Sequence, residues 1–216
     1  MDVLEAIRTR RTAGKIRPDV PPRALIEEII EAATWAPNHR LNEPWRFFVV
    51  AGEARDRFGR LMAADACQGL EDPTGDTASG IVEAQLKKAA RSPVIIAAVC
   101  DPPSNPKIDP IEDVCAVACG VQNLMLAAHA RGLATRWSSG QACYSPAIKS
   151  FFGLTPEHQI LGYIYLGYPD ESSKSPTRTP HHEKTTWLGW PGDYLQVERD
   201  KVDEQLNIAD EVSTTH

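Results

Sequence analysis

A cluster of cations follows the first amphipathic segment of the chain and could bind an anion. Five basic side chains and no acidic one occur between residues 8 and 17: Arg8, Arg10, Arg11, Lys15 and Arg17. Arginine presents a planar fork of donors that matches phosphate oxygens in pairs, so the pattern indicates a phosphate site. The alternative is that these arginines only keep the end of a helix in water, as basic runs often do.

A second segment, residues 34–50, carries side chains suited to a planar polar ligand. It reads Thr-Trp-Ala-Pro-Asn-His-Arg-Leu-Asn-Glu-Pro-Trp-Arg-Phe-Phe-Val-Val and joins a predicted helix to a predicted strand. Trp35 offers an aromatic face, while His39 and Asn42 offer hydrogen-bonding groups. A histidine in such a loop is, taken alone, more often a surface or capping residue. Together the two segments predict the two halves of one cofactor site.

The elements that must position these residues follow from hydrophobic periodicity and from proline and glycine punctuation. The pattern predicts helices over residues 2–10, 22–35, 53–66, 81–91, 109–131 and 146–152. It predicts strands over residues 46–50, 93–100, 133–138 and 159–167. Because helices and strands alternate, the fold class is mixed α/β, that is α+β.

The longest predicted helix is apolar or small almost all the way round between residues 114 and 130. This predicts burial on every face, as a core or dimer-interface helix. A membrane span is not expected, because the apolar stretch falls short of roughly 18 to 20 residues. The stretch also contains Gln122, Asn123 and His129.

Charge is concentrated at the end of the chain. The 216 residues carry a net charge of −6, and seven acidic against two basic residues place −5 of it in residues 193–216. We therefore expect one domain over residues 1–192 and an acidic C-terminal tail over residues 193–216. The nearly neutral body argues against nucleic-acid binding. The first residues show no signal-peptide pattern, so a cytoplasmic location is expected.

The five cysteines are odd in number and lack Cys-x-x-Cys spacing, so neither a disulfide framework nor a metal site is expected. Cys115 and Cys119, one helical turn apart, are expected to pack in the core. The chain also lacks a nucleophile elbow, a Walker loop and a Gly-x-Gly-x-x-Gly turn. No catalytic residue is assigned, because a bound cofactor would carry the chemistry.

Three short motifs give the chain a family resemblance: residues 10–12 (Arg-Arg-Thr), residues 36–49 and residues 137–140 (Trp-Ser-Ser-Gly). Their order and spacing resemble those of the nitroreductase-like FMN-dependent flavoproteins, in particular the short single-domain branch, from about residue 2 to residue 190. The resemblance implies a central, mostly antiparallel sheet flanked by helices. It also implies an intertwined homodimer with FMN at each subunit interface.

The resemblance assigns site residues by position. Arg10 and Thr12 would hold the phosphate and ribityl end, and Arg11 the pyrimidine ring or the phosphate. The remaining flavin contacts would be Trp35, His39 (reaching across the dimer), Asn42, Trp137, Ser138, Ser139 and Arg178. A purely structural, core-packing role for Trp137 is the alternative. The chain departs from the family pattern at Glu43, where glutamine is common, which leaves Glu43 either facing solvent or shifting the flavin's redox behaviour.

The implied activity is an NAD(P)H oxidoreductase that reduces nitroaromatic or quinone-type acceptors by ping-pong hydride transfer through flavin N5. The choice between NADH and NADPH and the physiological acceptor are not fixed by the residues. Three alternatives stay open: another reductive reaction on the same scaffold, a flavin-binding sensor or carrier with little turnover, and a flavin-free structural dimer.

Overall fold

The computed structural model describes residues 1–103, 105–170 and 176–188. The chain divides into two compact units, Met1–Ser175 and Pro176–His216, which are described separately. The described residues of the first unit form the sheet and six α-helices. In the second, the described residues 176–188 hold one short 3-10 helix, η3 (His181–Lys184), and are exposed. The predicted domain boundary at residue 192 and the acidic tail lie outside the described residues.

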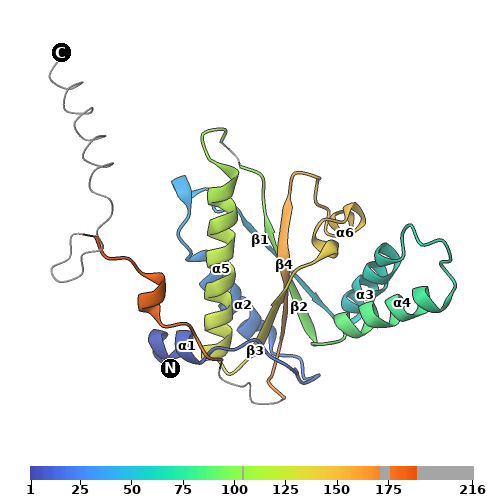
Figure 1. Cartoon of the computed structure of the whole chain (residues 1–216), viewed down its shortest axis with the longest axis horizontal. Coiled ribbons are helices and arrows are strands. Elements are labelled where there is room, and N and C mark those ends of the chain that lie inside the picture. The colour runs from blue at the N-terminus through green and yellow to red at the C-terminus, as the bar shows by residue number, and fades with distance from the viewer. Residues whose placement is uncertain (104, 171–175, 189–216) are drawn as a thin grey trace, which may run out of the picture. The chain divides into compact units, whose positions relative to one another are not determined.

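A four-stranded antiparallel sheet forms the centre of the first unit (Figure 1). Its strands are β1 (Trp45–Ala51), β2 (Val94–Cys100), β3 (Ala134–Ser138) and β4 (Gln159–Gly167), in the order β1-β2-β4-β3. The apolar run of β2 is buried at every position because the strand has neighbours on both sides and both its faces are covered. The predicted fold class, with its mostly antiparallel sheet, is confirmed.

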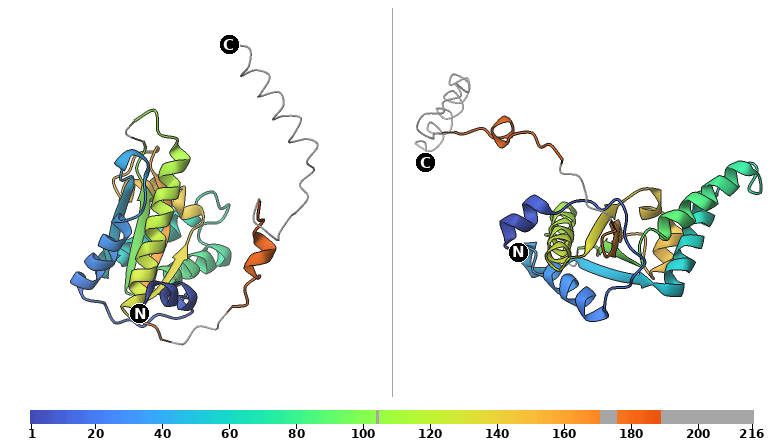
Figure 2. Two further views of the ribbon diagram at one scale, coloured as in Figure 1. Left: turned by 90° about the vertical axis from the view of Figure 1, so that its left-hand side faces the viewer. Right: turned by 90° about the horizontal axis from the view of Figure 1, so that it is seen from below.

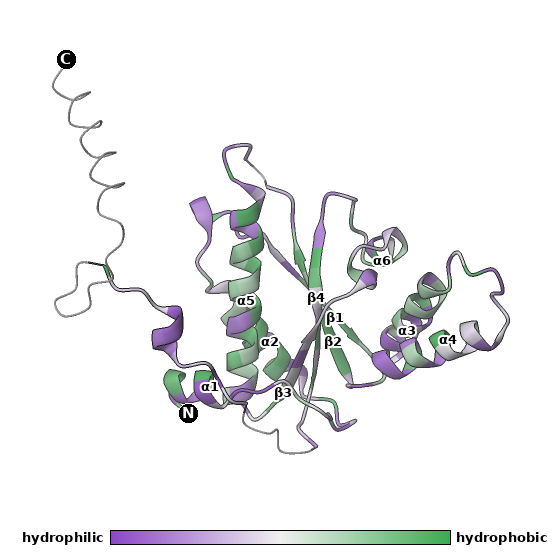
Figure 3. Cartoon of the chain, viewed as in Figure 1, coloured by the Kyte–Doolittle hydropathy of each residue, from purple (hydrophilic) through white to green (hydrophobic). Residues whose placement is uncertain are grey.

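Helices cover both faces of the sheet, as Figures 1 and 3 show. They are α1 (Val3–Thr9), α2 (Arg23–Thr34), α3 (Gly52–Ala66), α4 (Asp76–Ala89), α5 (Pro110–Ala130) and α6 (Pro146–Phe151). Alternate residues of β2 point to opposite faces. Val94, Ile96 and Ala98 pack with α2 and α5, whereas Ile95, Ala97 and Val99 pack with α3 and α6. Two apolar layers therefore hold the sheet from both sides.

The predictions for β1 and α4 differ from the structure. β1 was expected to be buried, but it is only half-buried because it is the edge strand and has a single neighbour. α4 begins at Asp76, five residues before the predicted start. The Asp72 side chain accepts hydrogen bonds from the backbone and hydroxyl of Thr74, which ends the preceding loop early and lets the helix start there.

α5 has 21 residues and is capped at its N-terminus by Asp109, whose side chain accepts a hydrogen bond from the Ile111 backbone amide. Among the described residues it is the one helix with the length and apolar composition of a membrane span. The expectation that its apolar stretch is too short was therefore wrong. The side of α5 that faces the sheet is buried against the sheet and α2, as in a core helix.

Within a single chain α5 is not buried on every face, so of the two alternatives the one in which α5 is a core helix of the chain is wrong. Cys115 and Cys119 are exposed in the single chain, as is Gln122. These residues share the side of α5 that faces away from the sheet. The predicted core packing of Cys115 and Cys119 is wrong for the single chain, because apolar composition does not show which side of a helix another element covers. Cys100 and Cys143 are buried, as expected of free cysteines.

Candidate functional site

The predicted phosphate-binding segment lies at the end of α1, beside the start of β3. Arg10 caps the helix, Thr12 forms a parallel bridge with Thr135, and the Ala13 amide donates to the Thr135 carbonyl at 2.9 Å. These contacts hold the segment against a strand more than a hundred residues away. A cavity of about 350 Å³ opens here, lined by Thr9, Arg10, Arg11, His129 and residues 132–135, together with Met1, Ala13 and Pro169.

Arg11 is oriented by the backbone that surrounds it. Its Nη1 donates to the carbonyls of Arg8 at 2.6 Å and Arg10 at 2.8 Å. Its Nε is buried and has no hydrogen-bond partner among the described residues. A buried donor without a partner costs free energy, so an anion accepting from this group would stabilise it. With Arg10 beside it, the cavity has the donor chemistry that a phosphate monoester requires.

His129, which the sequence did not predict as a site residue, lines the same cavity. Its Nε2 lies 2.8 Å from the Thr9 hydroxyl. Partial burial lowers the pKa of His129, and the nearby charges of Arg10 and Arg11 lower it further. The imidazole is thus favoured in its neutral form. Thr9 and His129 are separated by 120 positions in the sequence, so there is no local sequence signal for this contact.

The second predicted half of the site lies where α2 ends and the chain turns toward β1. Trp35 caps α2 and is 81% exposed. The 3-10 turn η1 (His39–Leu41) follows, and the φ angles of Arg40, Leu41 and Glu43 are positive, at 53°, 53° and 48°. Such angles are unfavourable for residues with side chains, so other contacts must hold this loop in place.

The start of α5 supplies one set of those contacts. The Asn42 side-chain amide donates to Asp113 Oδ2 at 2.8 Å, and Asp113 is completely buried. His39 Nδ1 lies 3.8 Å from a carboxylate oxygen of Glu112. Asn42 thus anchors the loop. Glu43 is exposed in the chain.

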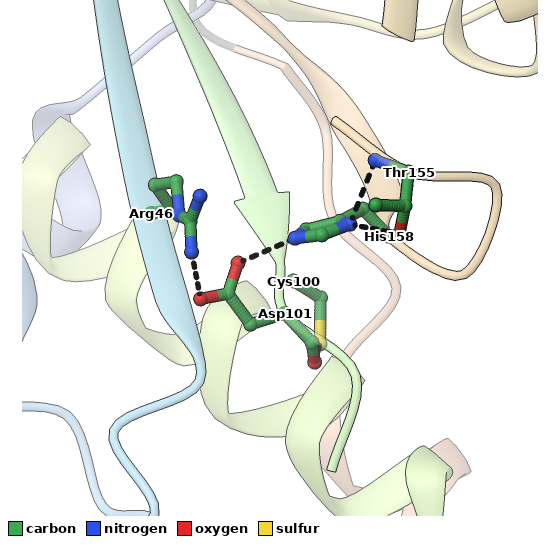
Figure 4. Close-up of polar contacts among 5 residues, drawn as sticks. All are labelled: Arg46, Cys100, Asp101, Thr155 and His158. Atoms are coloured by element: carbon green, nitrogen blue, oxygen red, sulfur yellow. Dashed lines mark hydrogen bonds and ion pairs between the residues drawn. The ribbon is translucent and has the colours of Figure 1, made fainter. Parts of the chain in front are cut away.

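Asp101, at the end of β2, supplies the second set (Figure 4). Its amide donates to the Pro44 carbonyl at 2.8 Å, and its Oδ2 accepts from Arg46 at 2.7 Å. Its Oδ1 lies 3.5 Å from Nε2 of the buried His158, whose Nδ1 accepts from the Thr155 amide at 3.1 Å. The sequence did not predict this network, because it joins residues from three distant segments.

Next to this network, the Cys100 thiol is not a candidate nucleophile. Burial raises its pKa to about 12, and the charges of Asp113 and Asp101 contribute to the increase. The thiol therefore stays protonated near neutral pH.

Trp137, Ser138 and Ser139 lie at and just beyond the end of β3. The Trp137 indole donates to the Leu161 carbonyl at 3.2 Å, and its ring edge lies directly against Gly162. Trp137 is 37% exposed, so it packs on the sheet while leaving part of the ring accessible. The packing role considered for this residue is present in the structure. Arg178 lies in the second unit, where it is exposed.

The structure brings only some of the predicted residues together. Arg10, Arg11 and Thr12 lie at the C-terminal end of α5 and beside β3, the strand that carries Trp137 and Ser138. His39 and Asn42 contact the first turn of α5. Trp35 follows the end of α2, where Ala33 and Ala36 lie against Gly120 in the middle of α5. Asp113 and His129, which mark the two ends, are about 24 Å apart along the helix axis at roughly 1.5 Å per residue. One chain therefore does not join the two halves.

Comparisons with known proteins give this arrangement a family. The model of the Nitroreductase family matches residues 7–168. An Escherichia coli (strain K12) protein named "Putative NAD(P)H nitroreductase YdjA" is 31% identical over 181 residues, which cover 83% of this chain and 95% of the relative.

Solved structures agree with this assignment. A nitroreductase-like family protein from Bacillus cereus has a TM-score of 0.77 at 26% identity, covering 88% of this chain and 97% of the other. A Desulfovibrio desulfuricans protein described as a "putative nitroreductase in complex with FMN" has a TM-score of 0.67 at 25% identity, covering 88% and 99%. The family model spans most of the chain and the E. coli relative matches over nearly its whole length, so the chain belongs to the nitroreductase family.

Proposed function

We propose that this protein is an FMN-dependent NAD(P)H oxidoreductase that reduces nitroaromatic or quinone-type acceptors by a ping-pong mechanism. Family membership supports the reaction class. The name of the E. coli relative supports the NAD(P)H donor, and the FMN complex of the D. desulfuricans protein supports the cofactor.

The observation that carries the proposal is the basic cavity beside Arg10 and Arg11. Thr9, Arg10 and Arg11 line a space of about 350 Å³, and the Nε of Arg11 is buried without a hydrogen-bond partner among the described residues. An FMN phosphate carries about two negative charges near neutral pH and three acceptor oxygens, which match these donors. We assign Arg10 and Thr12 to the phosphate and ribityl end, and Arg11 to the phosphate or the pyrimidine ring.

The second half of the site would come from another subunit. Since His39 and Asn42 lie about 24 Å along α5 from the arginines, a mononucleotide bound by the arginines would not reach them in the same chain. A homodimer solves this problem when the arginine end of one subunit meets the loop of the other. Trp35 and His39 would then border the flavin ring, with Asn42 holding their loop in place through Asp113.

Bound FMN would supply, at its N5, the hydride-transfer chemistry between NAD(P)H and the acceptor. The chain's own residues would bind and orient. Trp137 would border the ring system from the end of β3, and the hydroxyls of Ser138 and Ser139 would donate hydrogen bonds beside it. We assign no catalytic acid. A cytoplasmic location is part of the proposal and is supported by the five free cysteines, since reduced thiols are typical of that compartment.

An anaerobic absorbance experiment tests the function. The purified protein, reconstituted with FMN, is mixed with one equivalent of NADH or NADPH and then with a nitroaromatic or a quinone. We expect flavin bands that bleach with the donor and recover with the acceptor. Bleaching without catalysed recovery would favour a sensor or carrier, and the absence of flavin bands after reconstitution would overturn the proposal.

A further inference from the structure

The side of the sheet that α3 and α6 cover carries a buried hydroxyl with unused hydrogen-bonding capacity. In the right panel of Figure 2, α3 and α4 lie on the other side of the sheet from α1 and α5. The hydroxyl belongs to Tyr165 on β4, whose side chain is 0% exposed, and it has no hydrogen-bond partner among the residues that the structure describes. Such a group costs free energy unless a water or an ion binds it.

Arg136 lies next to Tyr165 on the same face of the sheet. The two residues are directly opposite each other in the antiparallel pairing of β3 and β4, which places their Cβ atoms about 4.5 to 5.5 Å apart. Arg136 is half-buried, and its Nη1 donates to the Ala13 carbonyl at 3.4 Å. A guanidinium has five N–H donors, so this long hydrogen bond leaves most of its donor capacity for a ligand.

Two more cations reach the same region from the end of α4. Arg91 lies between α4 and β2, and Pro93, two residues further on, lies against Gly167 of β4. The Arg91 amide donates to the Lys88 carbonyl at 3.4 Å. Burial lowers the pKa of Lys88, and the charge of Arg91 lowers it further. Lys88 and Arg91 are therefore close enough to repel each other.

The charges of the two arginines also act on the buried hydroxyl. Burial raises the pKa of Tyr165 to about 12, while the positive charges of Arg91 and Arg136 limit the increase. The phenol is thus protonated at neutral pH and can donate a hydrogen bond. Within the described ranges, none of Lys88, Arg91 and Arg136 forms a salt bridge with a carboxylate. An anion among these groups would relieve their repulsion and satisfy the phenol.

We propose that the Tyr165 hydroxyl and the cations Arg91 and Arg136 bind a small oxyanion of the phosphate class, with Lys88 adding positive charge beside them. This second anion site is distinct from the cavity at α1. Alternate residues of a strand point to opposite faces, and Thr135 lines the first cavity while Arg136 faces the second site. The inference therefore stands apart from FMN binding and from the proposed function.

The donors define the class of ligand. Arginine forks match the oxygens of a phosphate in pairs, and the phenol donates to one further oxygen. Two arginines balance the roughly two negative charges of a phosphate group. Because the Tyr165 side chain is fully buried, only a small group can reach its hydroxyl. A free phosphate ion and the terminal phosphate of a nucleotide share this chemistry.

Calorimetric titration with inorganic phosphate tests the site. The FMN-reconstituted full chain is used in a chloride buffer, so that FMN fills the first cavity. We expect phosphate to bind the wild type, and Arg136→Gln and Tyr165→Phe each to weaken this binding at least fivefold. Lys87→Gln is the matched control, because Lys87 neighbours Lys88 but already pairs with Glu83. Its phosphate affinity should equal that of the wild type.

Tyr165→Phe also separates a binding role from a packing role. In chloride buffer the substitution removes only a hydroxyl without a partner, so the urea midpoint should stay unchanged or rise. Saturating phosphate should raise the midpoint of the wild type but not that of the variant, because a ligand stabilises only the protein that binds it. An equal fall of the variant's midpoint in both buffers would show that the fold itself uses the hydroxyl, and would overturn the site.

Two further outcomes would overturn the site: phosphate that binds wild type and Tyr165→Phe equally, and phosphate that does not bind the FMN-loaded wild type. Arg10→Ala without FMN makes the test independent of the proposed function, because this variant lacks a cation of the first cavity. Retained phosphate binding in Arg10→Ala supports the second site even if the wild type binds no FMN. Loss of binding in Arg10→Ala together with retention in Arg136→Gln would place the anion in the first cavity only.

Adenosine 5′-monophosphate distinguishes the two sources of the phosphate group. If it competes with inorganic phosphate in the wild type and not in Tyr165→Phe, the site accepts the terminal phosphate of a nucleotide. If inorganic phosphate binds and the nucleotide does not compete, the ligand is the free ion. Both results support the second anion site.

Discussion

The two ends of α5 hold the two halves of the candidate site in different ways. At the C-terminal end, Arg10, Arg11 and His129 surround an open cavity, and the Arg11 Nε has no partner among the described residues. At the N-terminal end, the Asn42 amide donates to the buried carboxylate of Asp113. Asp101 donates through its own amide to the Pro44 carbonyl and accepts from the Arg46 guanidinium. The first end has binding capacity that the fold does not use. At the second end, the polar groups form hydrogen bonds that hold a loop with unfavourable backbone angles in place.

This difference teaches that substitutions at the two ends should separate binding from stability. Changes among the arginines should weaken the cofactor and leave folding intact. Changes in the groups that position the loop, or in those that position the end of β3, should lower the free energy of unfolding more than they weaken cofactor binding.

The largest expected effect is at Gly162, which places Trp137. Its φ is +147°, and a Cβ there would lie 2.4 Å from Trp137 Nε1 and 2.8 Å from the Ser138 carbonyl. Gly162→Ala should lower the free energy of unfolding by about 3 kcal/mol or more, because overpacking and backbone strain add. Urea unfolding measures this. Gly153→Ala, at φ +67° with open space around it, should cost only about 1 kcal/mol. Equal costs at the two glycines would show that the Trp137 contact is not tight.

Arg10→Ala should weaken FMN binding by roughly 1.5 to 3 kcal/mol, since a charge-assisted bond to the phosphate is lost. The urea midpoint of the protein without added FMN should stay unchanged. Fluorescence titration of FMN gives the affinity, and Arg57→Ala, at an exposed position on α3, is the matched control. Unchanged FMN affinity would remove Arg10 from the phosphate site.

Asp113→Ala should reverse this pattern. It removes the hydrogen bond between the part-buried Asn42 amide and the buried carboxylate, which should lower the free energy of unfolding by roughly 1 to 3 kcal/mol. The effect on FMN affinity should follow from the loosened loop and be smaller than that of Arg10→Ala. Asp113→Asn keeps an acceptor of the same shape and should recover most of the lost stability. If both variants are as stable as the wild type, the loop does not depend on this bond.

Much of this frame was predictable because its signals are local. The apolar run of β2, the periodicity of α2 and the Asp109 cap of α5 each lie within the element they define. The basic segment was visible for the same reason, since its cations are close in sequence. The exposure of Cys115 and Cys119 was not, because periodicity identifies an apolar side but not what covers it.

The contacts that organise the candidate site could not be predicted, because they join distant residues. Asn42 meets Asp113 across 71 residues, and Thr9 meets His129 across 120. Asp101 follows the end of β2 and contacts Pro44 and Arg46 because of the register between β1 and β2. This contact can be predicted only when that register is known. Residue types indicated the chemistry of each half, while the separation of the halves along α5 required the fold.

The smallest expected effect is the pH dependence that His129 contributes at the arginine end. Its pKa is lowered in the folded protein by burial and by the charges of Arg10 and Arg11, so the unfolded chain binds a proton more readily. The stabilising contribution of neutral His129 is present above the unfolded pKa of about 6.5 and is lost as the pH falls through the lower folded value. The free energy of unfolding should therefore fall more steeply between pH 7 and pH 5 in the wild type than in His129→Gln. Urea unfolding at several pH values measures the slopes.

Adding inorganic phosphate should flatten the wild-type slope, because an anion held by the arginines raises the pKa of the imidazole of His129 beside it. An identical slope with and without phosphate would place the bound anion away from His129 and shift the phosphate site toward Thr12.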